Sequence, residues 1–425
     1  MARRVRGRRR RCGERTRVIG VEEHLARCLA AVAPLPPIDL ALLEALDCVL
    51  AEDVVARAML PAFDNSAMDG YAVHVSDVAS ATEERPVVLP VVADLPAGAS
   101  EALPLVPGSA VRIMTGAPVP PGTQAVVPVE WTDGGVASVT VRRSPRPGQN
   151  VRSAGEDVRP GEVLLTTGTR IAPRHVGLLA AAGLDRVRVR PRPRVVVLST
   201  GSELVEPGRP LGFGQIHDSN GYMLTAAAAD AGATALRAGW VADDARTLVS
   251  TLEDHLVRAD VVVTSGGVSA GAYDTVKEVL SRLGTVQFDR VAMQPGMPQG
   301  FGTLGDDDTP IFTLPGNPVS AYVSFEVFVR PALRKMMGEP QLHRPTVSAT
   351  VTEGWSSVAG KRQFVRVELT RDQAGRALVH PVGGHGSHLV ADLAQANALA
   401  VVPEETTRVV PGDTLRCMVL ERARR

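Results

Sequence analysis

The segment Ala259–Asp274, ADVVVTSGGVSAGAYD, decides the fold class of this chain. Its valine run predicts a buried strand, and the Gly-Gly pair after it predicts a tight turn before the next helix. The segment Ile311–Ser320, IFTLPGNPVS, repeats this plan with an apolar strand, a turn of proline and glycine, and a helix. Glycines let backbone N–H groups approach an anion, and the start of the following helix adds the positive end of its dipole. Together the two turns predict a site for a phosphate-bearing small molecule.

Strands and helices alternate around these turns from Arg194 onward. The expected strands are Val195–Leu198, Ala235–Val241 and Val261–Thr264, and the expected helices are Tyr222–Ala231, Ala245–His255 and Tyr273–Leu283. This alternation predicts a doubly wound parallel sheet, with helices on both faces as in three-layer α/β domains. The ligand of such a sheet lies at the carboxyl ends of its strands, where both glycine turns fall.

The remaining chain has two β-rich regions and a few helices. Short alternating runs broken by Pro and Gly between Phe63 and Arg143 predict an all-β module, and the chain turns all-β again after Gly338. Helical spacing predicts helices at Gly20–Ala33, Asp39–Leu46 and Ile171–Ala182. The predicted fold class is therefore α/β plus β, in several domains.

Composition limits the possible partners. The chain has 425 residues, too many for one core, and 44% hydrophobic and 22% charged residues are typical of a globular protein. Residues 1–17 contain nine arginines and one glutamate. Such a segment could bind nucleic acid or a membrane surface, but no apolar face accompanies the charge, and we expect a basic disordered tail. No apolar run reaches the roughly 18 residues of a membrane span, and few aromatic residues are available to stack on bases, so we expect neither a membrane nor a nucleic acid as partner.

The four cysteines are scattered along the chain without a CxxC pair. This spacing does not match a zinc ribbon and fits reduced thiols, which indicates a cytoplasmic location.

Acidic residues follow several of the predicted strands. They are Glu203, Asp218, Asp243, Asp244 and Asp274. Carboxylates gathered at one edge of a sheet suit Mg²⁺ bridging phosphates. Asp218 and Asp243 could instead cap the helices that follow them. Asn317, fixed between two prolines, could likewise present its amide to a ligand or cap a helix.

Three further polar segments lie in or beside the first β-rich region: Phe63–Val73, Arg112–Pro118 and Ala154–Arg159. Each could form a tight turn or carry side chains to a pocket.

Seven ordered motifs resemble the molybdopterin molybdenumtransferase family, which includes MoeA and the E domain of gephyrin. The motifs are NSAMDGYAV (65–73), RIMTGAPVP (112–120), AGEDV (154–158), STGSEL (199–204), IHDSNGYML (216–224), TSGGVSAGAYD (264–274) and LPGNPVSA (314–321). The resemblance runs from about Val18 to the C-terminus. It implies molybdenum insertion, in which adenylyl-molybdopterin and molybdate give Mo-molybdopterin and AMP with a divalent cation, usually Mg²⁺.

The resemblance also implies roles for individual residues. The catalytic set is Asp69, Thr115, Asp157, Glu203, Asp243 and Asp274, of which Glu203, Asp243 and Asp274 are the expected metal ligands. The substrate-binding set combines the glycine turns with positions that match the family, and consists of Ser265, Gly266, Gly267, Ser269, Arg290, Pro315, Gly316, Asn317, Pro318 and Ser387. His385 and His388 flank Ser387, and we expect both to be surface residues.

One segment departs from the family pattern. In Phe288–Pro298, FDRVAMQPGMP, Gln294 and Met297 stand where family members often carry lysine. The guanidinium of arginine is a planar group of N–H donors, whereas the ammonium of lysine is a point charge, so an arginine does not bind an anion in the same way. The remaining candidates to hold the molybdate dianion are Arg290, Lys361, Arg362 and the amides of Gly266 and Gly267.

The resemblance further implies a domain plan and an elongated homodimer. The plan places a discontinuous linker domain at 18–58 and 149–186, an inserted β module at 59–148, an α/β molybdopterin-binding domain at 187–338 and a C-terminal β domain at 339–425, its fold resembling a β-barrel. It sets the cleft between the first β module of one subunit and the α/β and last domains of the other. Transient contacts with molybdopterin-synthesis enzymes and apo-molybdoenzymes are also expected.

Three alternative functions remain open. An adenylyltransferase that makes the adenylylated pterin has similar glycine turns, but it resembles only the module from Arg194 to Gly338. A scaffold like the gephyrin E domain, with weak or no catalysis, and a paralogue that acts on tungstate or another pterin are the other two. The β modules on both sides of the α/β module favour the molybdenum insertase.

Overall fold

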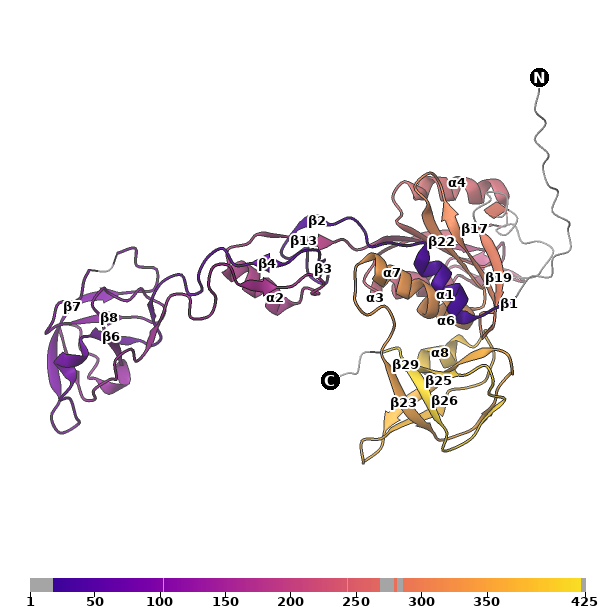
Figure 1. Ribbon diagram of the computed structural model, residues 1–425. Helices are drawn as coiled ribbons and strands as arrows, with labels where there is room; N and C mark the ends of the chain where they lie inside the picture. The colour runs from indigo at the N-terminus through magenta and orange to yellow at the C-terminus, as the bar shows by residue number, and fades with distance from the viewer. Residues whose placement is uncertain (1–17, 102, 243, 268–278, 281–285, 422–425) are drawn as a thin grey trace, which may run out of the picture. The chain divides into compact units, whose positions relative to one another are not determined.

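The computed structural model describes residues 18–421 except 102, 243, 268–278 and 281–285. These residues form two compact units (Figure 1). The α/β unit contains residues 18–38, 47–49 and 189–421, and the β unit contains Asp39–Leu46 and Leu50–Arg188. The finer division into four modules remains a prediction. The predicted tail at 1–17 and most of the predicted helix Tyr273–Leu283 lie outside the described residues.

A seven-stranded sheet organises the α/β unit, in the order β1-β19-β21-β22-β18-β14-β17. Its strands are β1 (Val18–Ile19), β14 (Arg194–Thr200), β17 (Thr234–Val241), β18 (Val261–Ser265), β19 (Gln287–Val291), β21 (Pro298–Leu304) and β22 (Thr309–Leu314). The four neighbours β17, β14, β18 and β22 run parallel, which confirms the predicted parallel core. Strand β21 runs antiparallel to β19 and β22, so this side of the sheet is mixed.

Helices cover both faces of this sheet (Figure 1). They are α1 (Val21–Ala30), α3 (Asn220–Asp230), α4 (Ala245–Leu256), α6 (Pro318–Ser324) and α7 (Arg330–Met336), with a π-helical turn η3 (Phe325–Val329) between the last two. Val195 and Val197 point into the core under α1, α3, α6 and η3. Val196 and Leu198 point into the core under α4. This alternation buries β14 on both faces, as expected for a central parallel strand.

A closed five-stranded barrel follows at the C-terminal end of the α/β unit. Its strands β23 (Thr346–Val351), β25 (Arg362–Arg371), β26 (Ala377–Pro381), β27 (Ala398–Val402) and β29 (Thr414–Val419) close through the β25–β27 pairing. The predicted all-β region after Gly338 is confirmed, with one short helix α8 (Val390–Gln395) added. Strand β20 (Met293–Gln294) pairs with β25 and so joins the barrel to the α/β sheet.

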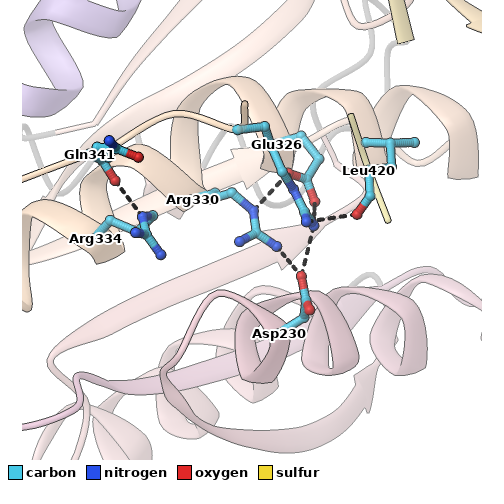
Figure 2. A network of polar contacts seen from close by, with 7 residues as sticks. Asp230, Glu326, Arg330, Arg334, Gln341 and Leu420 are labelled. Atoms are coloured by element: carbon cyan, nitrogen blue, oxygen red, sulfur yellow. Dashed lines mark hydrogen bonds and ion pairs between the residues drawn. The ribbon is translucent and has the colours of Figure 1, made fainter. Parts of the chain in front are cut away.

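A polar network around the buried Glu326 carboxylate joins the barrel to α3 and η3 (Figure 2). The Arg344 guanidinium donates hydrogen bonds to the Glu326 carboxylate (2.9 and 3.0 Å), to Asp230 (2.7 Å) and to the carbonyl oxygen of Leu420 (2.7 Å). Arg330 donates to the same two acids. Because Arg344 precedes the first barrel strand and Leu420 follows the last, the network fixes both ends of the barrel.

The β unit is built around a five-stranded sheet in the order β10-β7-β8-β6-β9. Its strands are β6 (Gly70–Val73), β7 (Val87–Leu95), β8 (Ala110–Ile113), β9 (Ala125–Pro128) and β10 (Ser138–Val141), with 3₁₀ turns η1 (Val75–Val78) and η2 (Val129–Trp131). The segments before and after this sheet pair with each other through β4 (Val54–Val55) with β12 (Val163–Leu165) and β5 (Asn65–Ser66) with β11 (Val151–Arg152). Helix α2 (Pro173–Ala181) confirms the helix predicted there.

The predicted helix Asp39–Leu46 is wrong. The chain forms strand β2 (Ile38–Ala41) and then turns, up to Asp47 in the left-handed region. Strand β2 pairs with β13 (Arg186–Arg190), which also pairs with β3 (Val49–Leu50). Pairing with a distant strand has overridden the local helical spacing.

Among the described residues, no helix combines the length and apolar character that crossing a membrane would require.

Candidate substrate site

The first glycine turn follows strand β18 directly. Gly266 and Gly267 have φ angles of +97° and +70°, a region that side chains disfavour. A Cβ atom on Gly266 would lie 2.5 Å from the Thr200 carbonyl oxygen, so only glycine lets this turn approach the end of β14 so closely. The turn thereby brings the carboxyl ends of β14 and β18 together.

The second turn, Pro315–Pro318, packs against the first. The Gly266 amide donates to the Leu314 carbonyl oxygen (3.1 Å), and a Cβ on Gly316 would lie 3.6 Å from the Gly266 Cα. Pro318 begins α6, and Asn317 precedes it without a hydrogen bond from its side chain to the helix. Asn317 is exposed, so the side-chain capping alternative is not realised in this structure. The structure therefore brings Ser265, Gly266, Pro315 and Gly316 together, as the sequence predicted.

Asn220, at the start of α3, was not among the predicted site residues, although the motif IHDSNGYML contains it. Its Nδ2 donates to Ser265 Oγ (2.7 Å) and to the Gly316 carbonyl oxygen (2.6 Å). Ser265 Oγ in turn donates to the Pro315 carbonyl oxygen (3.3 Å). One amide side chain therefore contacts both glycine turns.

The acids after the predicted strands have different surroundings. Asp218 is 1% exposed and accepts from Ser199 Oγ (2.8 Å) and the Gly221 amide (2.9 Å), which is the helix-start role left open by the sequence. Asp244 caps α4 by accepting from the Thr247 amide and hydroxyl, and these bonds lower its pKa.

Glu203 is exposed just beyond the end of β14, where the Gly201 amide bonds to Val241 at the end of β17. Asp243, Asp274 and Ser269 lie outside the described residues. Among the residues that are described, no group of three or more His, Cys, Asp or Glu side chains is arranged to hold a metal ion.

Arg290 lies at the same edge of the sheet as the second turn. It pairs with Pro298 across β19 and β21, and the register of β21 with β22 places Pro298 level with Pro315. Its guanidinium rests against the Met297 sulfur (3.1 and 3.3 Å). Arg362, another candidate anion donor, is instead bound by Glu22 (2.5 Å) and Glu404 (3.0 Å).

Ser387 lies in a glycine-rich loop of the barrel that contacts the start of α6. The Val319 amide donates to the Ser387 carbonyl oxygen (3.0 Å). His385 and His388 beside it are exposed, as expected.

A cavity of about 400 Å³ lies between this loop, neighbouring segments of the barrel and the start of α6. Its lining includes Gln294, Trp355, Gln363, Arg366 and the loop from Gly383 to Gly386. The Trp355 indole N–H and Gln363 Oε1 are buried and have no hydrogen-bond partner in the described part of the chain. Arg366 donates to the carbonyl oxygens of Gly384, Gly386 and Leu389, and burial lowers its pKa. The sequence analysis named Gln294 only as a departure from the family pattern, and it missed the other polar groups of this cavity.

In the β unit, the three polar segments predicted as turns or pocket residues come together. Strand β5 pairs with β11, the Gly116 amide donates to the Ser66 carbonyl oxygen (2.8 Å), and the Ala154 amide donates to Asp64 (2.7 Å). These bonds connect segments that are far apart in the sequence.

Asp69 and Thr115 form a direct pair at this junction. The Asp69 carboxylate accepts from both the amide and the hydroxyl of Thr115, each at 2.7 Å. These two bonds lower the Asp69 pKa, so the exposed carboxylate stays ionised. Asp157 is exposed on the neighbouring loop, where its amide donates to the Leu60 carbonyl oxygen. Its catalytic role stays a prediction.

The fold and this site define a class of protein. Two glycine turns at the carboxyl edge of a parallel sheet, with backbone amides and polar side chains around them, are typical of α/β proteins that bind phosphate-bearing ligands.

Three family models match the chain. They describe the MoeA N-terminal region (domain I and II) at residues 19–183, a probable molybdopterin-binding domain at 196–335 and the MoeA C-terminal region (domain IV) at 348–420. Molybdopterin molybdenumtransferase 2 of Mycobacterium tuberculosis is 49% identical over 402 residues, which cover 93% of this chain and 98% of the relative. The molybdopterin molybdenumtransferase of Bacillus subtilis is 37% identical and covers 89% of both chains.

A solved structure of a molybdopterin biosynthesis MoeA protein from Pyrococcus horikoshii matches at 30% identity with a TM-score of 0.72, covering 95% of this chain and 100% of that one. The chain therefore belongs to the molybdopterin molybdenumtransferase (MoeA) family, and it is a transferase with a role in molybdenum cofactor biosynthesis.

Proposed function

We propose that this chain is the molybdenum insertase of that biosynthesis, converting adenylyl-molybdopterin and molybdate to Mo-molybdopterin and AMP. The observation that carries the proposal is the pair of interlocked glycine turns. Ser265, Gly266 and Gly316 present backbone groups beside the positive end of a helix, at the edge of the sheet where such ligands bind.

The proposed chemistry needs no covalent nucleophile from the protein. The dithiolene sulfurs of the pterin bind molybdenum, and the phosphoanhydride bond breaks so that AMP leaves with its negative charge. The amides of Gly267 and Gly316 would bind this phosphate charge, and fixed donors of this kind are most effective where charge develops. Asp69, held ionised by Thr115, is the polar group that we propose for the β unit.

A divalent cation, Mg²⁺, fits the oxygen chemistry of the predicted ligands. Glu203 is exposed at the carboxyl end of β14 and offers a hard oxygen donor. Glu203, together with Asp243 and Asp274, would hold the ion, which would supply charge neutralisation for the pyrophosphate.

The cavity beside Ser387 is our candidate for the molybdate position. It offers a buried indole N–H on Trp355 with no other partner, the Arg366 guanidinium and a glycine-rich loop whose backbone can approach an oxyanion. Gln294 lines the same cavity as a neutral side chain. Arg290 is the alternative donor, since it lies at the same sheet edge as Pro315. Arg362 is a weaker candidate because two carboxylates already bind it.

We further propose that the chain works as a cytoplasmic homodimer. The buried thiols of Cys28 and Cys417, which form no disulfide, support a reducing compartment. Light scattering should give twice the 44.8 kDa mass of the chain, and a monomeric mass would contradict the dimer.

The test of function is molybdate-dependent release of AMP from adenylyl-molybdopterin, with Mg²⁺ present. The wild-type chain should release AMP, and Trp355→Phe, which removes the indole N–H together with part of the ring, should raise the molybdate concentration needed. Trp131→Phe, in the β unit, is the matched control. Release of AMP without molybdate would contradict the insertase, and no release at all would favour a scaffold. Consumption of ATP with unmodified molybdopterin would instead indicate an adenylyltransferase.

A further inference from the structure

Asn220 bonds to both glycine turns at once. Its Nδ2 carries two protons, and the two donated bonds to Ser265 Oγ and the Gly316 carbonyl oxygen use both of them. The turns belong to strands β18 and β22, while Asn220 belongs to α3. The side chain therefore ties three elements together at one point.

The orientation of this amide follows from its partners. A carbonyl oxygen can only accept, so the atom 2.6 Å from the Gly316 oxygen must be the nitrogen. The Asn220 Oδ1 then points away, is buried, and has no hydrogen-bond partner in the described part of the chain. An unpaired buried acceptor costs free energy, so stabilising the start of α3 does not by itself explain an asparagine at this position. Its two donated bonds must account for its presence.

The start of α3 is itself held rigidly, which makes the bridge a fixed one. Buried Asp218 bonds to Ser199 on β14 and to the amide of Gly221. A Cβ on Gly221 would lie 2.4 Å from Asp218 Oδ2, so the residue after Asn220 is restricted to glycine. Arg237 on β17 pairs with Asp218 from the other side (3.4 Å). Asn220 therefore approaches the turns from an anchored position.

We propose that Asn220 is a positioning residue that locks the two glycine turns into the geometry that binds the phosphate-bearing substrate. It acts through Ser265 and Gly316 rather than by touching the substrate. The proposal deepens the proposed function, and it rests on that function only for its kinetic readout.

Two variants separate this role from a general structural one. Asn220→Ala removes both donated bonds. Asn220→Asp keeps the shape but places a carboxylate oxygen against the Gly316 carbonyl oxygen, with no proton to donate. Ser219→Asp is the matched control, because it adds the same charge at the neighbouring exposed position, where no side-chain capping bond exists.

The first measurement is hydrogen exchange of the Gly266 amide, whose bond to Leu314 joins the two turns. Exchange should be about tenfold faster in both Asn220 variants and unchanged in Ser219→Asp. This measurement uses the full-length chain without substrate. It therefore tests whether Asn220 holds the two turns together even if the wild type fails to release AMP. Exchange at the wild-type rate in Asn220→Ala would overturn the proposal.

The second measurement is binding and turnover. The Kd for AMP and the KM for adenylyl-molybdopterin should rise about tenfold in Asn220→Ala, with a smaller change in kcat, because a preorganised binding geometry is lost. The double variant Asn220→Ala with Ser265→Ala should be less than additive in Kd, since both remove one shared bond. Faster exchange accompanied by wild-type Kd and KM would leave Asn220 a structural residue and overturn its positioning role. Absence of AMP release by the wild type would count against the insertase alone.

Discussion

At the residue scale, Thr115 lowers the pKa of the Asp69 carboxyl through two groups, its amide and its hydroxyl. The Thr115 amide and hydroxyl both donate to Asp69, and both bonds lower its pKa. We expect Thr115→Val to raise the Asp69 pKa, because the hydroxyl bond is lost while the amide bond remains. The measurement is an NMR titration of the side-chain carboxyl carbons.

The β unit offers a matched control for this prediction. Asp133 accepts from the Thr140 amide (2.9 Å) and hydroxyl (2.6 Å), and these bonds lower its pKa to about 2. Thr140→Val should raise the Asp133 pKa and leave both Asp69 and AMP release unchanged. If Thr115→Val leaves the titration of Asp69 as it was, the hydroxyl is not what holds this carboxylate ionised.

His24 is a buried base that makes the α/β unit sensitive to acid. It is 1% exposed, its ring meets Phe328 edge-on at 4.7 Å between centroids, and Nδ1 has no partner in the described part of the chain. Burial lowers its pKa from 6.5 to about 4. Between these values the unfolded state binds a proton that the folded state does not, so stability is lost as the pH falls.

The loss should approach about 3 kcal/mol in free energy of unfolding between pH 6.5 and pH 4. Replacing the ring with an apolar one of similar shape, in His24→Phe, should remove this part of the pH dependence. Urea denaturation across this pH range measures it, with exposed His343→Gln as the control. An unchanged slope in His24→Phe would assign the acid sensitivity to other groups.

At the element scale, Arg344 connects α3, η3 and the end of the barrel through a single side chain (Figure 2). Its partner Glu326 is buried, and Arg330 binds the same carboxylate. Arg344→Ala should lower the free energy of unfolding by about 3 kcal/mol, because the buried Glu326 carboxylate loses one of its two arginine partners. Arg416→Ala, an exposed arginine on β29, should change it by less than about 0.5 kcal/mol. Equal effects of the two substitutions in urea denaturation would show that the network contributes no specific stability.

The elements also show what sequence patterns can predict here. The valine runs of β14 and β18 were predicted closely and the barrel region was predicted as all-β, because burial on both faces or on alternate residues leaves a clear pattern. Segment Asp39–Leu46 failed because its pairing partner β13 lies far along the chain, where local spacing carries no information. Strand β21, which makes the sheet mixed, was missed because glycines interrupt its apolar pattern.

The candidate site also contains features that the sequence predicts and features that it does not. The glycine turns were predictable because a turn after a buried strand is a local signal, and the structure brings them together. Asn220 was not predicted as a site residue, since its function depends on which backbone atoms lie opposite its amide. The cavity around Trp355 and Gln363 also required the fold, because its lining comes from segments that only the barrel and β20 bring together.

At the scale of the whole molecule, the two units have separate hydrophobic cores. Leu198, Val263 and Phe328 belong to clusters of the α/β unit, whereas Tyr71 and Val126 belong to clusters of the β unit. Cooperative unfolding follows shared cores, so a chain of this kind should not behave as one two-state system. We expect two transitions in a calorimetric scan.

One substitution in each unit can assign these transitions. In the β unit, a Cβ on Gly70 would lie 2.0 Å from the Val127 carbonyl oxygen, on the partner strand, so Gly70→Ala should destabilise this unit by about 2–3 kcal/mol. It should lower one melting temperature, and Arg344→Ala should lower the other. Gly177→Ala, in α2 of the same unit, is the control, because a Cβ there meets no atom within 4 Å and alanine favours a helix. If Gly70→Ala and Arg344→Ala move both transitions together, the two units unfold as one cooperative body, and the pH and network effects argued for the α/β unit must then be measured on the whole chain.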